Sequence, residues 1–254
     1  MKKVTYCLMA LFITMMISVA VVEAATEITT LPRTITTQGS YIINKNLTST
    51  SNGIVVKVNN VTIDLNGYNI AGNNTGTHYG VYIQGRSNVE IRNGTIRNFG
   101  SHGIYEESSS GNSHRVINVR VMNNRGYGIH LDGSNHMVKD CTASNNNGDL
   151  GIYAGSGSTV IGNTAYDNGK SGILAGYGST VIGNTAYSNG LNGIITDTGC
   201  TVKNNTAVNN QSVGISINTY NLVDGNTAYD NCLSGGVCTN MRSCPTCVFG
   251  DNVQ

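Results

Sequence analysis

The chain contains no tryptophan, only two prolines and few charged residues for its 254 positions. Its 15 lysines and arginines nearly balance its 14 aspartates and glutamates, so the net charge is close to zero. A protein that binds nucleic acid needs a basic surface to neutralise the phosphates. This chain offers no such basic stripe, and we expect no nucleic-acid partner.

Glycine is abundant instead, with 32 residues, and Asn, Ser and Thr fill many of the remaining positions. A composition of this kind is typical of disordered chains when the residues are scattered. Here the same residue types return at regular intervals. The regularity favours a repeat protein over a disordered one.

The first residues have the features of an export signal. Met1-Lys2-Lys3 precedes an apolar run from Val4 to Val22 and the small residues around Ala24. This pattern predicts a signal peptide over residues 1–24, cleaved after Ala24. An uncleaved membrane anchor is the alternative, because the run is barely long enough to span a bilayer. No second run of that length follows, so we expect a secreted, monomeric protein in the periplasm or outside the cell, away from the membrane.

A phrase in which Gly precedes Ile or Val recurs along the chain. Eight of these phrases begin at Gly53, Gly80, Gly103, Gly128, Gly151, Gly172, Gly193 and Gly214. The last four glycines are evenly spaced, with a period of about 21 residues, and the earlier units are slightly longer. A unit of this length is too short for two helices and a turn, and it lacks the hydrophobic period of a helix. It predicts three short strands separated by Gly and Asn turns.

Such a unit cannot bury its own apolar side, but stacking at about 4.8 Å per coil makes a continuous core. We therefore predict an all-β parallel β-helix of about eight coils with three short strands per coil. An N-terminal cap over residues 25–52, the β-helix over 53–234 and a Cys-rich cap over 235–254 complete the organisation. Three inward columns are expected, represented by Ile152, Val160 and Ala165 and their equivalents.

Two columns of asparagine accompany the repeat. One contains Asn163, Asn184, Asn205 and Asn226, with Asn93 earlier, and the other contains Asn98, Asn124, Asn146, Asn168, Asn189, Asn210 and Asn231. Asparagine tolerates left-handed turns, and its amide can bond to the identical amide one coil away. We expect structural ladders, with glycan contact as the alternative.

At this point two phrases carry a family resemblance. Residues 60–70, Asn-Val-Thr-Ile-Asp-Leu-Asn-Gly-Tyr-Asn-Ile, resemble the opening of right-handed β-helix proteins of the pectate-lyase-like superfamily, and residues 89–96 resemble their next rung. The resemblance extends from Gly53 to Asn231 and implies a right-handed β-helix. It does not imply one activity, because this fold hosts lyases, hydrolases, epimerases and adhesins. The signatures of polygalacturonases, pectate lyases and alginate epimerases are missing, so we expect no standard pectin-degrading enzyme.

Ionisable residues gather in coils two to four, which begin at Gly80, Gly103 and Gly128. All five histidines and six of the eight arginines lie between positions 78 and 136, whereas residues 151–231 contain neither. Alternation along the first strand of each coil turns the second and fourth residues after the glycine outward. The outward residues of this region are Tyr82, Gln84, Tyr105, Glu107, His130, Asp132 and Tyr153. This strip predicts a glycan site, with ordinary packing of tyrosines on a sheet as the alternative.

A polysaccharide lyase would use the strip as follows. His130 is the candidate base, and Tyr105 or Tyr153 would return the proton to the leaving oxygen. Glu107 and Asp132 would orient His130 or raise its pKa; as the only adjacent carboxylates on the strip, they are also the pair that a hydrolase would need. We place Tyr82, Gln84 and Arg120 in substrate binding. The alternative function is a non-catalytic structural or glycan-binding protein of the cell exterior.

We expect no cofactor and no metal, because no pair of histidines has helical or close-turn ligand spacing. Glu106 falls at an inward position, which is costly for a charge, and we expect a bulge beside residues 108–111 to release it.

Six cysteines follow the predicted signal peptide. Four of them, Cys232, Cys238, Cys244 and Cys247, crowd the last coil and the tail. In an exported chain they predict two disulfides that close the open end of the stack, with zinc binding as the alternative. Cys141 and Cys200 are about 14 Å apart along the axis, beyond disulfide reach, and are expected to be unpaired.

Overall fold

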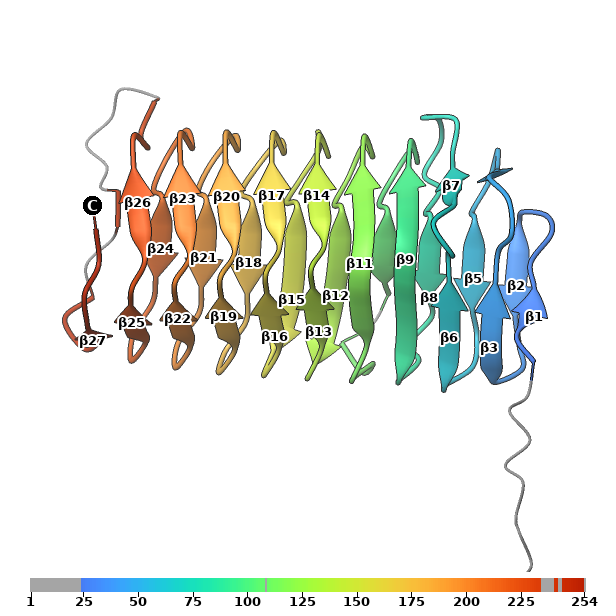
Figure 1. Cartoon of the computed structure of the whole chain (residues 1–254), viewed down its shortest axis with the longest axis horizontal. Helices are drawn as coiled ribbons and strands as arrows, with labels where there is room; N and C mark the ends of the chain where they lie inside the picture. The colour runs from blue at the N-terminus through green and yellow to red at the C-terminus, as the bar shows by residue number, and fades with distance from the viewer. Residues whose placement is uncertain (1–23, 108, 234–239, 242–243, 254) are drawn as a thin grey trace, which may run out of the picture.

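The computed structural model describes residues 24–107, 109–233, 240–241 and 244–253. They form an elongated stack of parallel strands, with β1 (Thr26–Glu27) at one end and β27 (Val248–Phe249) at the other (Figure 1). The predicted all-β, right-handed parallel β-helix is confirmed. The described residues contain no helix, and so none long and apolar enough to cross a membrane.

One sheet supplies a single strand from each turn, and this nine-stranded sheet carries the candidate site. Its strands in order are β2 (Arg33–Ile35), β5 (Ile54–Val56), β8 (Val81–Ile83), β10 (Ile104–Glu106), β12 (Ile129–Ser134), β15 (Ile152–Ser156), β18 (Ile173–Ala175), β21 (Ile194–Thr196) and β24 (Ile215–Ile217). The stack therefore has about nine turns where the repeat predicted eight. The extra turn comes from β2, which pairs in register with β5 but lacks the glycine that marks the later coils.

The second sheet has 18 strands, in most turns two per turn. In chain order they are β1, β3 (Gly39–Ile42), β4 (Leu47–Thr48), β6 (Val61–Asp64), β7 (Asn69–Ala71), β9 (Val89–Arg97), β11 (Arg115–Met122), β13 (Met137–Lys139), β14 (Thr142–Ser144), β16 (Thr159–Ile161), β17 (Thr164–Tyr166), β19 (Thr180–Ile182), β20 (Thr185–Tyr187), β22 (Thr201–Lys203), β23 (Thr206–Val208), β25 (Leu222–Asp224), β26 (Thr227–Tyr229) and β27. In β9 and β11 the two strands of one turn run together, since β9 pairs with both β6 and β7.

The core follows the three predicted columns. Ile152, Val160 and Ala165 are fully buried, as are their equivalents in the neighbouring turns. A glycine precedes the first strand of each later coil because the backbone of the next turn lies too close to leave room for a side chain. A Cβ on Gly172 would lie 2.7 Å from the carbonyl oxygen of Gly193. The recurring Gly-Ile phrase therefore records a position where two coils touch.

The asparagine ladders are present in the interior. Asn184 Nδ2 donates to the carbonyl of Val160 at 2.9 Å and to Asn205 Oδ1 at 3.0 Å. Its own Oδ1 accepts from the backbone N–H and the amide of Asn163. The left-handed backbone lies one residue earlier, at positions such as Gly183 and Asn204. The ladder asparagine is thus free to turn inward and bond to buried backbone groups.

Two asparagines do not belong to the ladders in which we expected them. Asn93 and Asn98 have left-handed backbones and are half-buried. Phe99, not Asn98, takes the ladder position, and its N–H donates to Asn124 Oδ1 at 3.0 Å. The coils differ in length in this region. Counting residues from the repeat glycine therefore places the ladder position one residue too early.

Candidate functional site

Seven aromatic rings lie against one another on the outer side of the nine-stranded sheet. They are Tyr79, Tyr82, His102, Tyr105, Tyr127, His130 and Tyr153, and we call them the aromatic face. All seven are half-buried. They form a continuous surface over β8, β10, β12 and β15.

The centre of this face is a row set by strand register. Tyr82, Tyr105, His130 and Tyr153 pair side by side across the four strands. Their ring centroids are 6.0, 5.2 and 4.8 Å apart in that order. The structure thus brings together the four rings that alternation had placed on one strip.

Three further rings widen the face and were missed in the sequence. Tyr79, His102 and Tyr127 each precede a repeat glycine by one residue. Tyr79 and His102 pack on Tyr105 at 4.9 and 4.8 Å, and Tyr127 packs on His130 at 4.5 Å. The sequence did contain a signal for them, because all three residues stand directly before a repeat glycine. The alternation along the first strand concerns only the residues after that glycine.

Burial keeps the histidines of the aromatic face neutral. It is the main reason that the pKa of His102 falls to about 4, with repulsion from His130 as the second cause. The pKa of His130 is also lowered, again chiefly by burial, although Asp132, Glu106 and Asp149 act in the opposite direction. Asp132 therefore acts on the pKa of His130 in the expected direction, but burial has the larger effect. Desolvation of the imidazole outweighs the nearby carboxylates.

Carboxylates border the row and hydrogen-bond to its tyrosines. Partial burial and a hydrogen bond with Glu107 raise the pKa of Tyr82 to about 12. Burial, then the charge and hydrogen bond of Asp132, raise the pKa of Tyr153. Both hydroxyls are protonated at neutral pH, so they donate to the carboxylates. Gln84 also hydrogen-bonds to Tyr82, which places every predicted strip residue on this face.

A hollow of about 490 Å³ continues the same side of the sheet beyond Tyr153. Leu174, Ile195 and Ser216 line it, and strand register places them in the row that begins at Tyr82. Its other lining residues include Asp197, Asn218, Thr219, Cys244 and Pro245. One wall of this hollow thus comes from the C-terminal tail, through Cys244 and Pro245.

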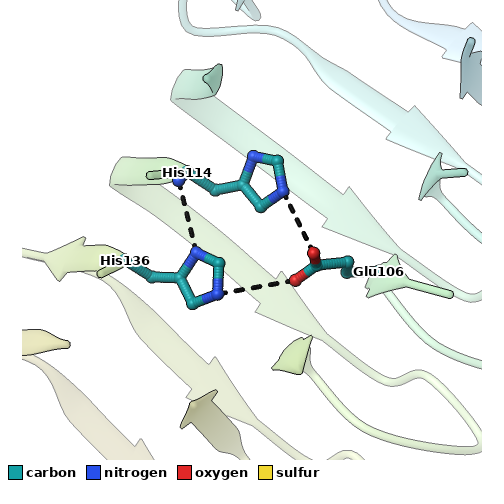
Figure 2. A group of neighbouring side chains, drawn as sticks. All are labelled: Glu106, His114 and His136. Atoms are coloured by element: carbon teal, nitrogen blue, oxygen red, sulfur yellow. Dashed lines mark hydrogen bonds and ion pairs between the residues drawn. The ribbon is translucent and has the colours of Figure 1, made fainter. Parts of the chain in front are cut away.

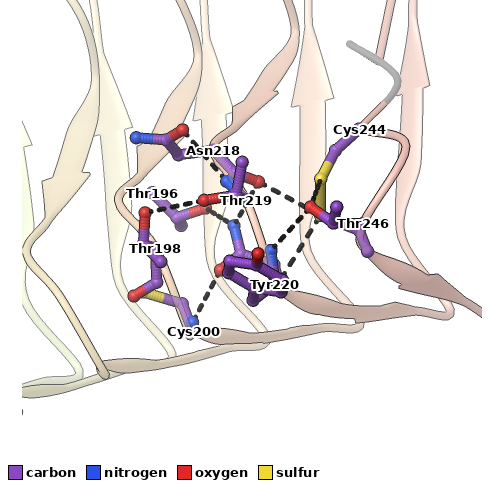
Figure 3. Close-up of a disulfide and its surroundings, with 10 residues drawn as sticks. Thr196, Thr198, Cys200, Asn218, Thr219, Tyr220, Cys244 and Thr246 are labelled. Carbon is purple, nitrogen blue, oxygen red and sulfur yellow. Dashed lines mark hydrogen bonds between the residues drawn. A yellow bond between two sulfur atoms is a disulfide. The ribbon is translucent and has the colours of Figure 1, made fainter.

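The tail segment that walls the hollow contains a disulfide between Cys244 and Cys247 (Figure 3). Tyr220 N donates to Thr246 Oγ1 at 3.3 Å, and Asn221 N donates to Cys247 Sγ at 3.3 Å. These bonds attach the tail to the last turn. Cys232 is also disulfide-bonded, while Cys238 lies outside the described residues. Cys141 and Cys200 are buried and free, as predicted.

Arg120 does not belong to the aromatic face. It lies on β11 of the 18-stranded sheet, where its Nε donates to Thr95 Oγ1 at 3.1 Å. Neighbouring arginines are paired with acids: Arg92 reaches Asp64 at 2.9 Å, and Arg115 reaches Glu90 at 2.7 Å. Arg120, which we expected to bind substrate, therefore lies on the other sheet, among arginines that pair with acids.

A second cluster lies inside the stack beneath β10 and β12. Glu106, His114 and His136 are buried, and both imidazole Nε2 atoms face the carboxylate (Figure 2). The Nε2–oxygen distances are 3.4 Å from His114 and 3.5 Å from His136, and Gly133 N donates to Glu106 Oε2 at 3.2 Å. The expectation that Glu106 escapes through a bulge is wrong. The histidines face it because they occupy the same position in successive turns.

This cluster has the composition of a divalent-metal site, since its three ligand atoms lie within 4.8 Å of one another. The hydrogen bonds of the two Nδ1 atoms argue against a metal site. His114 Nδ1 accepts from Val89 N at 3.1 Å, and His136 Nδ1 accepts from His114 N at 3.2 Å. A neutral imidazole whose Nδ1 accepts must carry its proton on Nε2. Both Nε2 atoms are therefore N–H groups directed toward the carboxyl group of Glu106, and a cation would have to displace two protons.

The fold and the aromatic face define a β-helix protein with one ring-lined side. The chain belongs to the right handed beta helix region family, which matches residues 108–252. No curated protein sequence matches the chain.

Several solved structures share the fold. The Azotobacter vinelandii mannuronan C-5 epimerase AlgE4 A-module is 17% identical, with a TM-score of 0.62 over 76% of this chain and 59% of that one. A variant of the periplasmic alginate epimerase AlgG is 15% identical, with a TM-score of 0.66 over 84% and 59%. Pectate lyase Pel9A is 15% identical, with a TM-score of 0.59 over 84% and 70%. The chain thus spans about three fifths of the two epimerase structures.

Proposed function

We propose that this protein is exported and binds polysaccharide along the aromatic face and into the adjoining hollow. The observation that carries the proposal is the contiguous set of seven half-buried rings on one side of the sheet. Aromatic rings present broad apolar faces with little conformational entropy to lose. Glu107 and Asp132 beside them can accept hydrogen bonds from sugar hydroxyls. The names of the similar structures, which include epimerases and a lyase of polysaccharides, agree with this class of ligand.

The test compares two tyrosine substitutions. Tyr105→Ala removes the central ring of the face, and we expect at least a tenfold loss of affinity for a bound glycan. Tyr187→Ala is the matched control, because Tyr187 stacks on Tyr166 at 4.9 Å on the other sheet. Glycan microarrays followed by calorimetry on each hit provide the measurement. Equal loss in both variants, or none in Tyr105→Ala, would contradict a binding site on this face.

Cleavage by a lyase mechanism is the second candidate function. The observation that favours it is the position of His130, neutral at neutral pH and flanked by Tyr105 and Tyr153. A neutral imidazole can take a proton from the sugar, and a protonated tyrosine can supply one to the leaving oxygen. Under this function His130→Ala lowers turnover about a hundredfold or more, measured by the absorbance of unsaturated products. Turnover that persists in His130→Ala would exclude His130 as the base.

A further inference from the structure

The outward charges of the nine-stranded sheet have one sign over most of its length. From β10 to β21 the outward carboxylates are Glu107 and Asp197, which follow the ends of β10 and β21, and Asp132, which lies within β12. Asp197 lines the hollow beyond Tyr153. No lysine or arginine occupies an equivalent described position on these turns.

The nearest cations are paired with an acid or lie at one end of the row. Lys170 pairs with Asp149 at 3.2 Å, and Arg86, whose Nε donates to the carbonyl of Gln84 at 2.8 Å, lies after β8 at the first turn of the row. Lys57 follows β5, before the first ring of the row. His102 and His130 are neutral at neutral pH because burial lowers the pKa of both. The middle of the face therefore presents acceptors and rings without a positive charge.

Such a surface repels a polyuronate. Two like charges about 4 Å apart repel by roughly 1 kcal/mol in bulk water and about 4 kcal/mol in the less polar setting near a protein surface. A uronate lying along the row would bring its carboxylates beside Glu107 and Asp132. An ammonium group in the same place would form charge-assisted hydrogen bonds with them. It would also lie over tyrosine rings, whose faces attract cations.

We propose that the face selects glycans that lack acidic groups and binds those with free amino groups most tightly. This inference rests on the proposed glycan-binding function and excludes the lyase mechanism, whose substrate must carry a uronate carboxylate. It separates the chain from the similar structures named for mannuronan, alginate and pectate, whose sugars are acidic.

The test uses four probes with the full-length protein: a chitosan hexamer, a chitin hexamer, polygalacturonate and alginate, the last two with calcium and with EDTA. We expect the chitosan hexamer to bind at least tenfold tighter than the chitin hexamer, and neither uronate to bind. Raising the salt concentration should weaken only the chitosan complex.

Charge-neutral variants identify the residues responsible. Glu107→Gln and Asp132→Asn keep an acceptor for the tyrosine hydroxyls, and each should weaken chitosan about tenfold while leaving chitin within twofold. Asp140→Asn is the matched control, because Asp140 lies in a turn after β13 on the other sheet, beside Lys139. Tyr105→Ala should abolish binding of both probes.

The outcomes separate the two proposals. Binding of chitin without a preference for chitosan refutes the charge selection and leaves the binding face standing. Uronate binding refutes it as well, and if calcium is required the carboxylates act as cation ligands. If none of the four probes and no glycan on an array binds, the proposed function itself fails.

Discussion

The two ring nitrogens of each buried histidine have different roles in this stack. His114, His136, Ser158 and Ser179 occupy one column, and each accepts a hydrogen bond from the backbone N–H of the turn before it. The imidazole Nδ1 thus does the work that a serine Oγ does two turns later. What the histidines add is an Nε2–H directed at Glu106.

The sequence could not reveal this cluster through ligand spacing. His114 and His136 are one full turn of the β-helix apart in the chain, which is not a spacing found in helical or close-turn sites. An alignment of the turns that placed His114 and His136 in one column with Ser158 would have revealed the cluster. Every residue in that column has a side-chain atom that can accept a hydrogen bond. The direction of the inward Glu106 was predictable, but its partners required the register between turns.

The first prediction tests the two roles of the imidazole separately. His136→Ser keeps an acceptor for His114 N–H but removes the Nε2–H that faces Glu106. His136→Ala removes both, and leaving a buried N–H unpaired costs about 1–3 kcal/mol. We expect both variants to be less stable than the native protein and the alanine variant to be the less stable of the two, by chemical denaturation. Equal stabilities would show that the Nδ1 bond contributes nothing.

The second prediction concerns zinc. Because both Nε2 atoms carry protons, millimolar Zn²⁺ should leave the melting temperature of the native protein unchanged relative to EDTA. A rise that disappears in His136→Ser would show that the cluster binds the ion and that the tautomers are wrong.

His136 of the buried cluster and His102 of the aromatic face make the stability of the fold sensitive to acid. Burial is the main cause that lowers the pKa of His136 to about 4, with Glu106 raising it and His114 lowering it, and His102 also falls to about 4. The folded state therefore binds fewer protons than the unfolded state between pH 4 and the unperturbed value near 6.5. Stability is fully present above about pH 6.5 and is lost as the pH falls toward 4. Each unit of pKa difference corresponds to about 1.4 kcal/mol.

Urea denaturation at several pH values measures this third prediction. The free energy of unfolding should decrease between pH 6.5 and 4, and the decrease should be smaller in His136→Ser. Unchanged stability down to pH 4.5 would contradict neutral buried histidines in the folded state.

At the scale of the elements, most strands of the later turns have only three residues, and the turns carry much of the specificity. The columns of β15, β16 and β17 were predictable because the even spacing of the later glycines repeats without insertion. The earlier turns after β5 are longer and vary in length, which misplaced Asn93 and Asn98, whereas β2 was missed because no repeat glycine precedes it. An inserted residue shifts the turns that follow it. Counting residues from one repeat glycine does not reveal whether the insertion lies before or after a given strand.

The fourth prediction distinguishes the two kinds of turn asparagine. Asn184→Ala leaves the buried N–H of Asn163 without its acceptor, at a cost of about 1–3 kcal/mol, and also removes the amide bond to the carbonyl of Val160. Asn204→Gly is the control, because Asn204 is exposed with a left-handed backbone that glycine adopts freely, as Gly183 does one turn earlier. Thermal denaturation should show a large loss in the first variant and a small change in the second. Similar losses in both would contradict the division between ladder and turn positions.

At the scale of the whole molecule, the aromatic face and the hollow form one line along the rod. The row runs from Tyr82 on β8 to Ser216 on β24, which is six turns, or roughly 29 Å at the spacing of parallel strands. The rings occupy the first half, and the hollow, which Cys244 and Pro245 of the tail help to line, lies along the second. Repetition in the sequence predicts the length of this surface. It does not predict the wall, because the tail lies outside the repeat and its path depends on contacts with the last turn.

The fifth prediction follows from this arrangement. The affinity for a bound glycan should rise with oligosaccharide length until the ligand reaches the hollow. The double variant Cys244→Ser with Cys247→Ser frees the segment around Pro245 and should remove only the last increase, leaving short oligosaccharides that cover the rings unaffected. Calorimetry with a length series on both proteins measures the effect, and Tyr105→Ala should instead weaken every length. A double variant that binds all lengths like the native protein would show that the hollow takes no part, and that the glycan ends at Tyr153.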